Sequence, residues 1–165
     1  MEVHDSILLL KNVLFTLFVP GTVAVYIPYC ITEQQVFSSG PMLLVAVALF
    51  AVGAAIYLWC VWDFAAFGRG APAPIDAPRH LVVRGPYRYT RNPMYVGVLT
   101  IIVGWAALFQ SASVLVYAIC VAACFHFFVV RCGERHLAHQ FGAEYAEYCA
   151  NVNRLLPRVR FQRAR

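Results

Sequence analysis

The sequence predicts an all-α integral membrane protein with four transmembrane helices, a cytoplasmic loop cap and a C-terminal amphipathic helix. Only 13% of the 165 residues are charged, about half the share found in an ordinary soluble domain. Hydrophobic residues make up 61% of the chain, and the mean hydropathy is +0.66. The charges are also gathered into blocks, with long uncharged runs between them. A soluble domain is therefore not expected.

The uncharged runs place the transmembrane helices. Runs of 21 and 29 uncharged residues precede Glu33 and Asp63, and a run of 39 precedes Arg131. A helix needs about 20 residues to cross a bilayer, so the first two runs each hold one span. The third run is divided by the polar residues 110–113 and holds two. The predicted spans are residues 7–29, 42–62, 93–109 and 114–130.

The basic residues predict how these spans are oriented. Segment 63–91 carries a net charge of +3 and segment 131–165 a net charge of +4. With four spans these segments share one side, and the positive-inside rule makes it cytoplasmic, together with both termini. The acidic head, with Glu2 and Asp5, argues against a cleaved signal peptide. We expect a single multi-pass membrane domain over residues 1–165, in the bacterial inner membrane or an equivalent membrane.

Two polar segments, 63–92 and 131–157, are expected to form the cytoplasmic region. The first is too rich in Gly and Pro to be helical and predicts a folded cap over the membrane domain. It ends at Asn92-Pro93, which predicts a helix N-cap followed by the first helical residue. The second repeats apolar residues at helical spacing, which predicts an amphipathic helix: Leu137, Phe141, Tyr145, Tyr148 and Val152. This helix could lie at the headgroup boundary or pack over the loop cap.

The last two predicted spans bring distant polar residues together. The short break between them makes them antiparallel neighbours, so Arg91, Asn92 and Tyr95 should face Arg131 and Glu134. Such a pocket offers arginines for an anion, one carboxylate and aromatic faces. A second interpretation of the same residues is that the arginines hold lipid phosphates and the tyrosines form an interfacial belt.

Neither the cysteines nor the histidines form a recognised metal-binding pattern. Cys120 and Cys124 are spaced i, i+4 in an apolar helix, which is a poor zinc site. The spacing of Glu134, His136 and His139 matches no recognised metal motif either. The cysteines are expected to be small hydrophobic residues. We expect no metal and no nucleic-acid partner.

The order of the motifs resembles one known group of proteins. The sequence is similar to the integral-membrane methyltransferases related to isoprenylcysteine carboxyl methyltransferase and the phospholipid N-methyltransferases. The resemblance covers residues 70 to 157 and is carried by Arg79-His80-Leu81-Val82, Gly85-Pro86-Tyr87, Arg91-Asn92-Pro93-Met94-Tyr95-Val96-Gly97, Glu134, Phe141-Gly142-Ala143-Glu144-Tyr145-Ala146-Glu147-Tyr148 and Arg154-Leu155-Leu156-Pro157.

The resemblance implies methyl transfer from S-adenosylmethionine, with S-adenosylhomocysteine as product, to a lipophilic or membrane-embedded acceptor. This acceptor would be an isoprenylcysteine-like carboxylate, a phospholipid amine or a small apolar thiol or amine. Membrane lipids are the implied partners. His80 would act as a hydrogen-bond donor to the cofactor or as a base. Carried over by position, the cofactor contacts are Arg79, His80, Leu81, Val82, Tyr87, Arg91, Asn92, Pro93, Met94, Tyr95 and Glu134.

Arg131 and Glu134 are the expected catalytic residues. Glu134 is the glutamate that the resemblance retains, and Arg131, one position from the family's substrate-binding arginine, is expected to bind the head of the acceptor. Three positions depart from the family pattern. Asn92 stands where relatives often have His, Gly133 replaces one of a pair of glutamates, and Val130 holds the place of a substrate-binding arginine. These departures keep a second hypothesis open, in which the chain is a non-catalytic membrane lipid-binding or scaffold protein with the methyltransferase fold.

Overall fold

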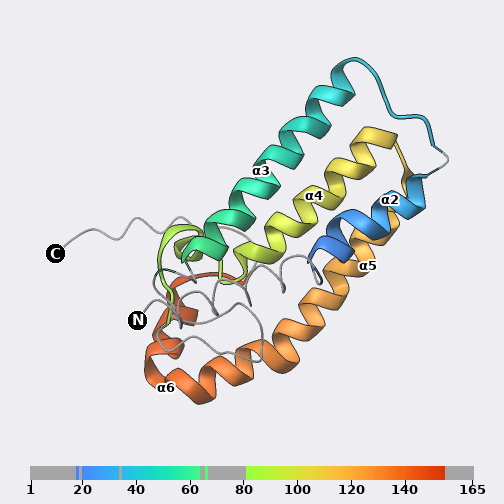
Figure 1. The fold of residues 1–165 in the computed structure, drawn as a ribbon. Helices are drawn as coiled ribbons and strands as arrows, with labels where there is room; N and C mark the ends of the chain where they lie inside the picture. Colours follow the sequence, from blue (N-terminus) through green and yellow to red (C-terminus); the bar gives the residue numbers. More distant parts are fainter. Residues whose placement is uncertain (1–17, 19, 34, 64–65, 67–80, 155–165) are drawn as a thin grey trace, which may run out of the picture.

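The computed structural model of the chain describes residues 18, 20–33, 35–63, 66 and 81–154. Every regular element in these ranges is helical, which confirms the all-α class for this part of the chain (Figure 1). In chain order the elements are η1 Thr22–Tyr26, α2 Ile27–Thr32, α3 Pro41–Asp63, η3 Gly85–Arg88, α4 Pro93–Phe109, α5 Ala112–Phe128, η4 Val129–Gly133 and α6 Glu134–Asn151.

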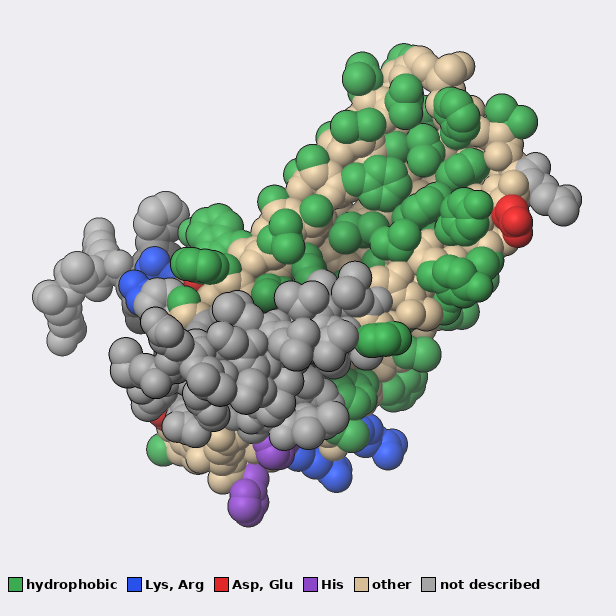
Figure 2. Space-filling model, viewed as in Figure 1, with side chains coloured by type: hydrophobic (Ala, Val, Ile, Leu, Met, Phe, Trp, Pro, Cys, Tyr) green, Lys and Arg blue, Asp and Glu red, His purple; other side chains and the backbone are tan. Residues whose placement is uncertain are grey.

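Two helical runs are long and apolar enough to cross a membrane. They are α3 and the continuous run Ala112–Asn151, whereas α4 and the run Thr22–Thr32 are shorter. Only 22% of the most apolar stretch in each long run is buried. Apolar side chains therefore cover the outer surface (Figure 2), such as Leu44, which is 73% exposed, and Ile119, which is 69% exposed. So large an exposed apolar surface suits contact with lipid.

The observed helices match most of the predicted boundaries. Helices α3 and α4 agree with the predicted spans 42–62 and 93–109 to within one residue. Helix α5 begins two residues before the predicted start, because the turn needs only Gln110 and Ser111. Gln110 adopts a left-handed conformation with φ of 48°, and the Ser111 N–H donates to the Ala106 carbonyl. Of the predicted span 7–29, residues 1–17 lie outside the described residues, and the helix ends at Thr32.

Helix α4 packs against α3 at a contact between two glycines. A Cβ atom on Gly97 would lie 2.9 Å from the Gly53 carbonyl and 3.1 Å from the Tyr57 nitrogen. Small residues of this kind let two apolar helices approach at their backbones. On its other side, α4 places Val98, Ile102 and Ala106 in a buried cluster that α5 and η1 also join.

Helix α5 passes into α6 without a break, through the π-helical turn η4. A π turn adds a residue to the helix and so rotates the face that α6 presents relative to α5. The predicted amphipathic helix is present as α6, but Gly142, with a φ of 51° and a ψ of −119°, puts a kink inside it. Glycine adopts this conformation without the steric cost of a Cβ. Past the kink, the chain turns back toward the start of α4 (Figure 1).

The kinked α6 packs over the loop cap. Its buried residues Tyr145 and Tyr148 join Val152 and pack against Leu81, which lies in the loop that precedes η3. The Tyr148 hydroxyl donates to the Tyr87 carbonyl over 2.7 Å. Of the two placements that the sequence left open, packing over the loop is the one observed.

The glycine contact predicts a packing defect for Gly97→Val. The new side chain would meet backbone atoms of α3, which cannot rotate away, so the helices must separate. We expect a loss of about 1–3 kcal/mol in stability, measured by thermal unfolding of the protein in detergent. Gly133→Ala is the control, because a Cβ there meets nothing within 4 Å. Equal effects of the two substitutions would contradict the close contact.

Candidate active site

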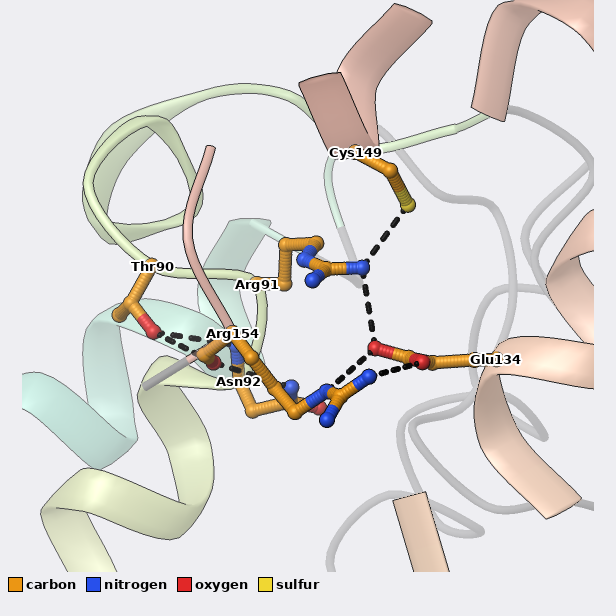
Figure 3. Close-up of polar contacts among 6 residues, drawn as sticks. All are labelled: Thr90, Arg91, Asn92, Glu134, Cys149 and Arg154. Atoms are coloured by element: carbon orange, nitrogen blue, oxygen red, sulfur yellow. Dashed lines mark hydrogen bonds and ion pairs between the residues drawn. The ribbon is translucent and has the colours of Figure 1, made fainter. Parts of the chain in front are cut away.

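The carboxylate of Glu134 is the centre of a charged cluster at the end of the helical bundle (Figure 3). Arg91, from the loop before α4, approaches it with Nη1 at 2.9 Å from Oε1. Arg154, beyond the end of α6, donates to both oxygens, from Nε over 2.8 Å and from Nη2 over 2.7 Å. Paired N–H donors of this kind fix a carboxylate in position as well as binding it.

The backbone after α6 is clamped onto the loop before α4. The Arg91 N–H donates to the Asn153 carbonyl over 3.0 Å. The Arg154 carbonyl accepts from Thr90 Oγ1 over 2.9 Å and from Asn92 Nδ2 over 3.2 Å (Figure 3). Asn92 does precede α4, with Pro93 first, but its side chain makes no capping bond. The predicted helix start at Asn92-Pro93 is therefore confirmed, and the Asn92 amide holds the Arg154 backbone instead of bonding to its own helix.

The loop itself is fixed by close packing against the end of α3. Gly85 has a φ of 51°, and a Cβ there would overlap Asp63 Oδ2 and lie 2.8 Å from Trp59 Nε1. The ring of Tyr87 is buried with Cys60 and Val82. These contacts hold the backbone from which Arg91 projects.

The structure brings together some of the residues predicted to bind a cofactor. Arg91, Asn92 and Glu134 all lie in the cluster or hold its backbone. Residues 40 or more apart in sequence do converge, as the predicted hairpin requires. Arg79 and His80 lie outside the described residues.

The other predicted contact residues serve packing in this structure. The Tyr95 ring stacks on Phe125 of α5 with centroids 4.3 Å apart, and the Tyr87 ring packs in the cluster around Cys60. Pro93 is buried, and Met94 packs between the two apolar clusters. Leu81 and Val82 are likewise in apolar contacts. The expected tyrosine-lined pocket is thus not formed by these two rings.

Arg131 lies apart from the cluster. It is in the π-helical turn η4, is exposed, and forms no ion pair with a described residue. A π turn holds more residues than an α turn, so side chains three positions apart across it do not lie on one face. Arg131 and Glu134 therefore point in different directions.

Sequence reasoning did not select Arg154, Cys149 or Tyr145 as site residues. Arg91 donates from Nη1 to Cys149 Sγ over 2.8 Å, and Tyr145 is hydrogen-bonded to Cys149 and Arg91. Arg154 and Tyr145 both stand within motifs that were quoted for the resemblance. Their convergence on Glu134 depends on the kink at Gly142, for which the glycine was the only signal.

The cluster has a net positive charge and a neutral aromatic wall. Two guanidiniums face one carboxylate, and the hydrogen bond to Glu134 raises the pKa of Arg154. Burial and the bond to Cys149 raise the pKa of Tyr145 to about 12, and burial also raises the pKa of Tyr148. Arg91 Nε is buried and has no hydrogen-bond partner among the described residues. The arrangement suits a ligand that carries an anionic group.

No three His, Cys, Asp or Glu side chains gather as a possible metal site within the described residues. The expected absence of a metal stays a prediction.

Comparisons with known proteins identify two similarities. A family model described as phospholipid methyltransferase matches residues 41–144, from the start of α3 to the middle of α6. The cobalt-zinc-cadmium resistance protein CzcN of Cupriavidus metallidurans is 35% identical over 83 residues. That match covers 50% of this chain and 38% of the relative's length. No solved structure matches significantly.

The ion pairs predict energetic coupling between Arg91 and Glu134. Arg91→Gln and Glu134→Gln should each cost about 1–3 kcal/mol. Arg91→Gln removes one of the two guanidiniums that pair with Glu134, and Glu134→Gln leaves both guanidiniums without an anion. The double variant should cost less than the two together by about 0.5–3 kcal/mol. Unfolding in detergent measures all three variants. Glu144→Gln, on the exposed side of α6, is the matched control, and additive costs would show that the pair is uncoupled.

The raised tyrosine pKa predicts a loss of stability at high pH. An unfolded tyrosine releases its proton near pH 10, whereas Tyr145 keeps it until about pH 12. Between these values the folded state binds more protons, so stability falls as the pH rises. Thermal unfolding in detergent from pH 8 to 11.5 should show this fall, and Tyr145→Phe should reduce it. An identical fall in both proteins would rule out this contribution.

Proposed function

Because the chain belongs to the phospholipid methyltransferase family, we propose that it transfers a methyl group from S-adenosylmethionine to a lipophilic or membrane-embedded acceptor. The observation that supports this most strongly is the Glu134 cluster, which joins three segments at one end of an apolar bundle. The acceptor class comprises isoprenylcysteine-like carboxylates, phospholipid amines and small apolar thiols or amines.

The residues of the cluster fit the polar groups of S-adenosylmethionine. Arg91 and Arg154 can hold an anionic group such as its carboxylate, and Arg91 Nε is a buried donor that has no partner among the described residues. Glu134 can accept hydrogen bonds from an amino group or a hydroxyl. Tyr145 stays neutral at physiological pH and can bind such groups without adding charge. Arg79, His80 and the backbone of 81–82 would complete the contacts from the loop.

Methyl transfer needs little acid–base chemistry from the protein. S-adenosylmethionine supplies a methyl group on a sulfonium that is already activated for attack. The protein must align the acceptor with that methyl and exclude water. In this proposal the clamp between residues 90–92 and 153–154 closes the polar side of the site. Arg131, exposed at the end of α5, would bind the head of the acceptor.

The arrangement of charges supports a membrane protein with the site on the cytoplasmic side. Arg84, Arg88 and Arg91 lie between the end of α3 and the start of α4. Glu33 follows α2, and the nearby Ser38 N–H donates to the Leu108 carbonyl at the opposite end of α4. We infer four spans, with both termini on the basic side, which the positive-inside rule makes cytoplasmic. Residues 63–92 and 131–157 then form the cofactor-binding region.

Calorimetric titration of the purified protein in detergent tests this proposal. Both S-adenosylmethionine and S-adenosylhomocysteine should bind saturably. Glu134→Gln should weaken binding at least tenfold, since hydrogen bonds to a charged group contribute about 1.5–3 kcal/mol. Glu144→Gln makes the same chemical change on the exposed side of α6 and should bind like the parent.

A different outcome would favour the scaffold hypothesis. If folded protein binds neither compound, in detergent or in lipid nanodiscs, the chain keeps the family fold without its chemistry. If both bind but Glu134→Gln has no effect, the cofactor site lies elsewhere.

A further inference from the structure

A groove of about 800 Å³ lies on the outer side of the loop, next to the Glu134 cluster. Its apolar wall is formed by Ile56 and Trp59 of α3 and by Val96 of α4. Arg84 and Arg88, from the loop and η3, line the same groove. The proposed methyl transfer does not use any of these residues.

The arginines of residues 84–93 fall into two groups. Arg91 and Asn92 face Glu134 and the Arg154 backbone, and neither lines the groove. Arg84 and Arg88 line the groove and do not contact Glu134 in the described structure. Thr90 lies at the boundary, because it lines the groove while its hydroxyl donates to the Arg154 carbonyl. The groove is therefore next to the Glu134 cluster, and its arginines are distinct from those that hold the carboxylate.

The charges in the groove favour an anion. Its described lining contains two arginines and no acidic residue. Arg84 is partly balanced, because it interacts electrostatically with Asp63 at the end of α3. Arg88 is exposed and forms no ion pair with a described residue, so one guanidinium is available to a ligand.

Exposed aromatic residues place the groove at the depth of lipid headgroups. Trp59, Trp62 and Tyr89 are 57%, 68% and 53% exposed, and they surround the end of α3 and the loop. Tryptophan and tyrosine gather at membrane–water interfaces because their rings are apolar and carry one polar group. Figure 2 shows basic side chains beside hydrophobic ones at this end of α3.

We propose that this groove binds a phospholipid from the adjacent leaflet, with its phosphate on Arg88 and its acyl chain along Ile56 and Val96. A free phosphate would not use the apolar wall, and an uncharged lipid would not use the arginine. The binding does not require a methyl donor, so it stands or falls independently of the proposed function.

Titration of the full-length protein in a nonionic detergent with dioctanoyl phosphatidylglycerol tests the proposal. The lipid should bind saturably without a methyl donor, and dioctanoylglycerol, which lacks the phosphate, should bind at least fivefold more weakly. Arg88→Gln should weaken phosphatidylglycerol binding about fivefold, the effect of one basic residue near a lipid phosphate. Arg88→Lys should retain most of it.

Arg135→Gln is the matched control, because Arg135 is an exposed arginine that does not line the groove. It should leave the affinity unchanged. Equal losses in the two glutamine variants would overturn the proposal, as would equal binding of the two lipids. Displacement of the lipid by millimolar inorganic phosphate would identify a phosphate site that does not recognise lipid. Size-exclusion profiles identical to the parent show that the variants are folded.

Discussion

The ion pairs of Glu134 are the interaction on which the polar end of this protein depends. This one carboxylate joins the loop before α4, the start of α6 and the chain beyond α6. Without it, the guanidiniums of Arg91 and Arg154 would lie close together with no anion between them. The hydrogen bonds that residues 90–92 donate to the carbonyls of residues 153–154 also hold these segments together. A small bundle with an apolar outer surface thus carries one organised polar region.

The apolar helices position this region and were also the most predictable part of the chain. Charge-free runs located α3 and α4 to within one residue, because the charged and polar residues that flank these apolar helices mark where they end. The hairpin of α4 and α5 then required Arg91 to approach Glu134, and the structure shows that contact. For these elements, hydrophobicity and chain connectivity were sufficient information.

The parts that sequence reasoning missed depend on local backbone geometry. The π-helical turn η4 rotates α6, and the conformation of Gly142 bends it, so Arg154 returns to a carboxylate 20 positions before it. Neither feature changes the spacing of apolar residues, so periodicity could not reveal them. The packing of Tyr87 and Tyr95 was not predicted for a related reason. An aromatic residue near polar residues can as readily pack against a neighbouring segment, as the buried Tyr87 and the half-buried Tyr95 do here.

Hydrogen–deuterium exchange would show whether the Glu134 cluster binds the cofactor. The protein in detergent would be compared with and without saturating S-adenosylhomocysteine. Our account predicts slower exchange in peptides that cover residues 84–95 and 134–154, with no change over residues 100–120. Slower exchange confined to other segments, or none at all under conditions where binding is saturated, would contradict it.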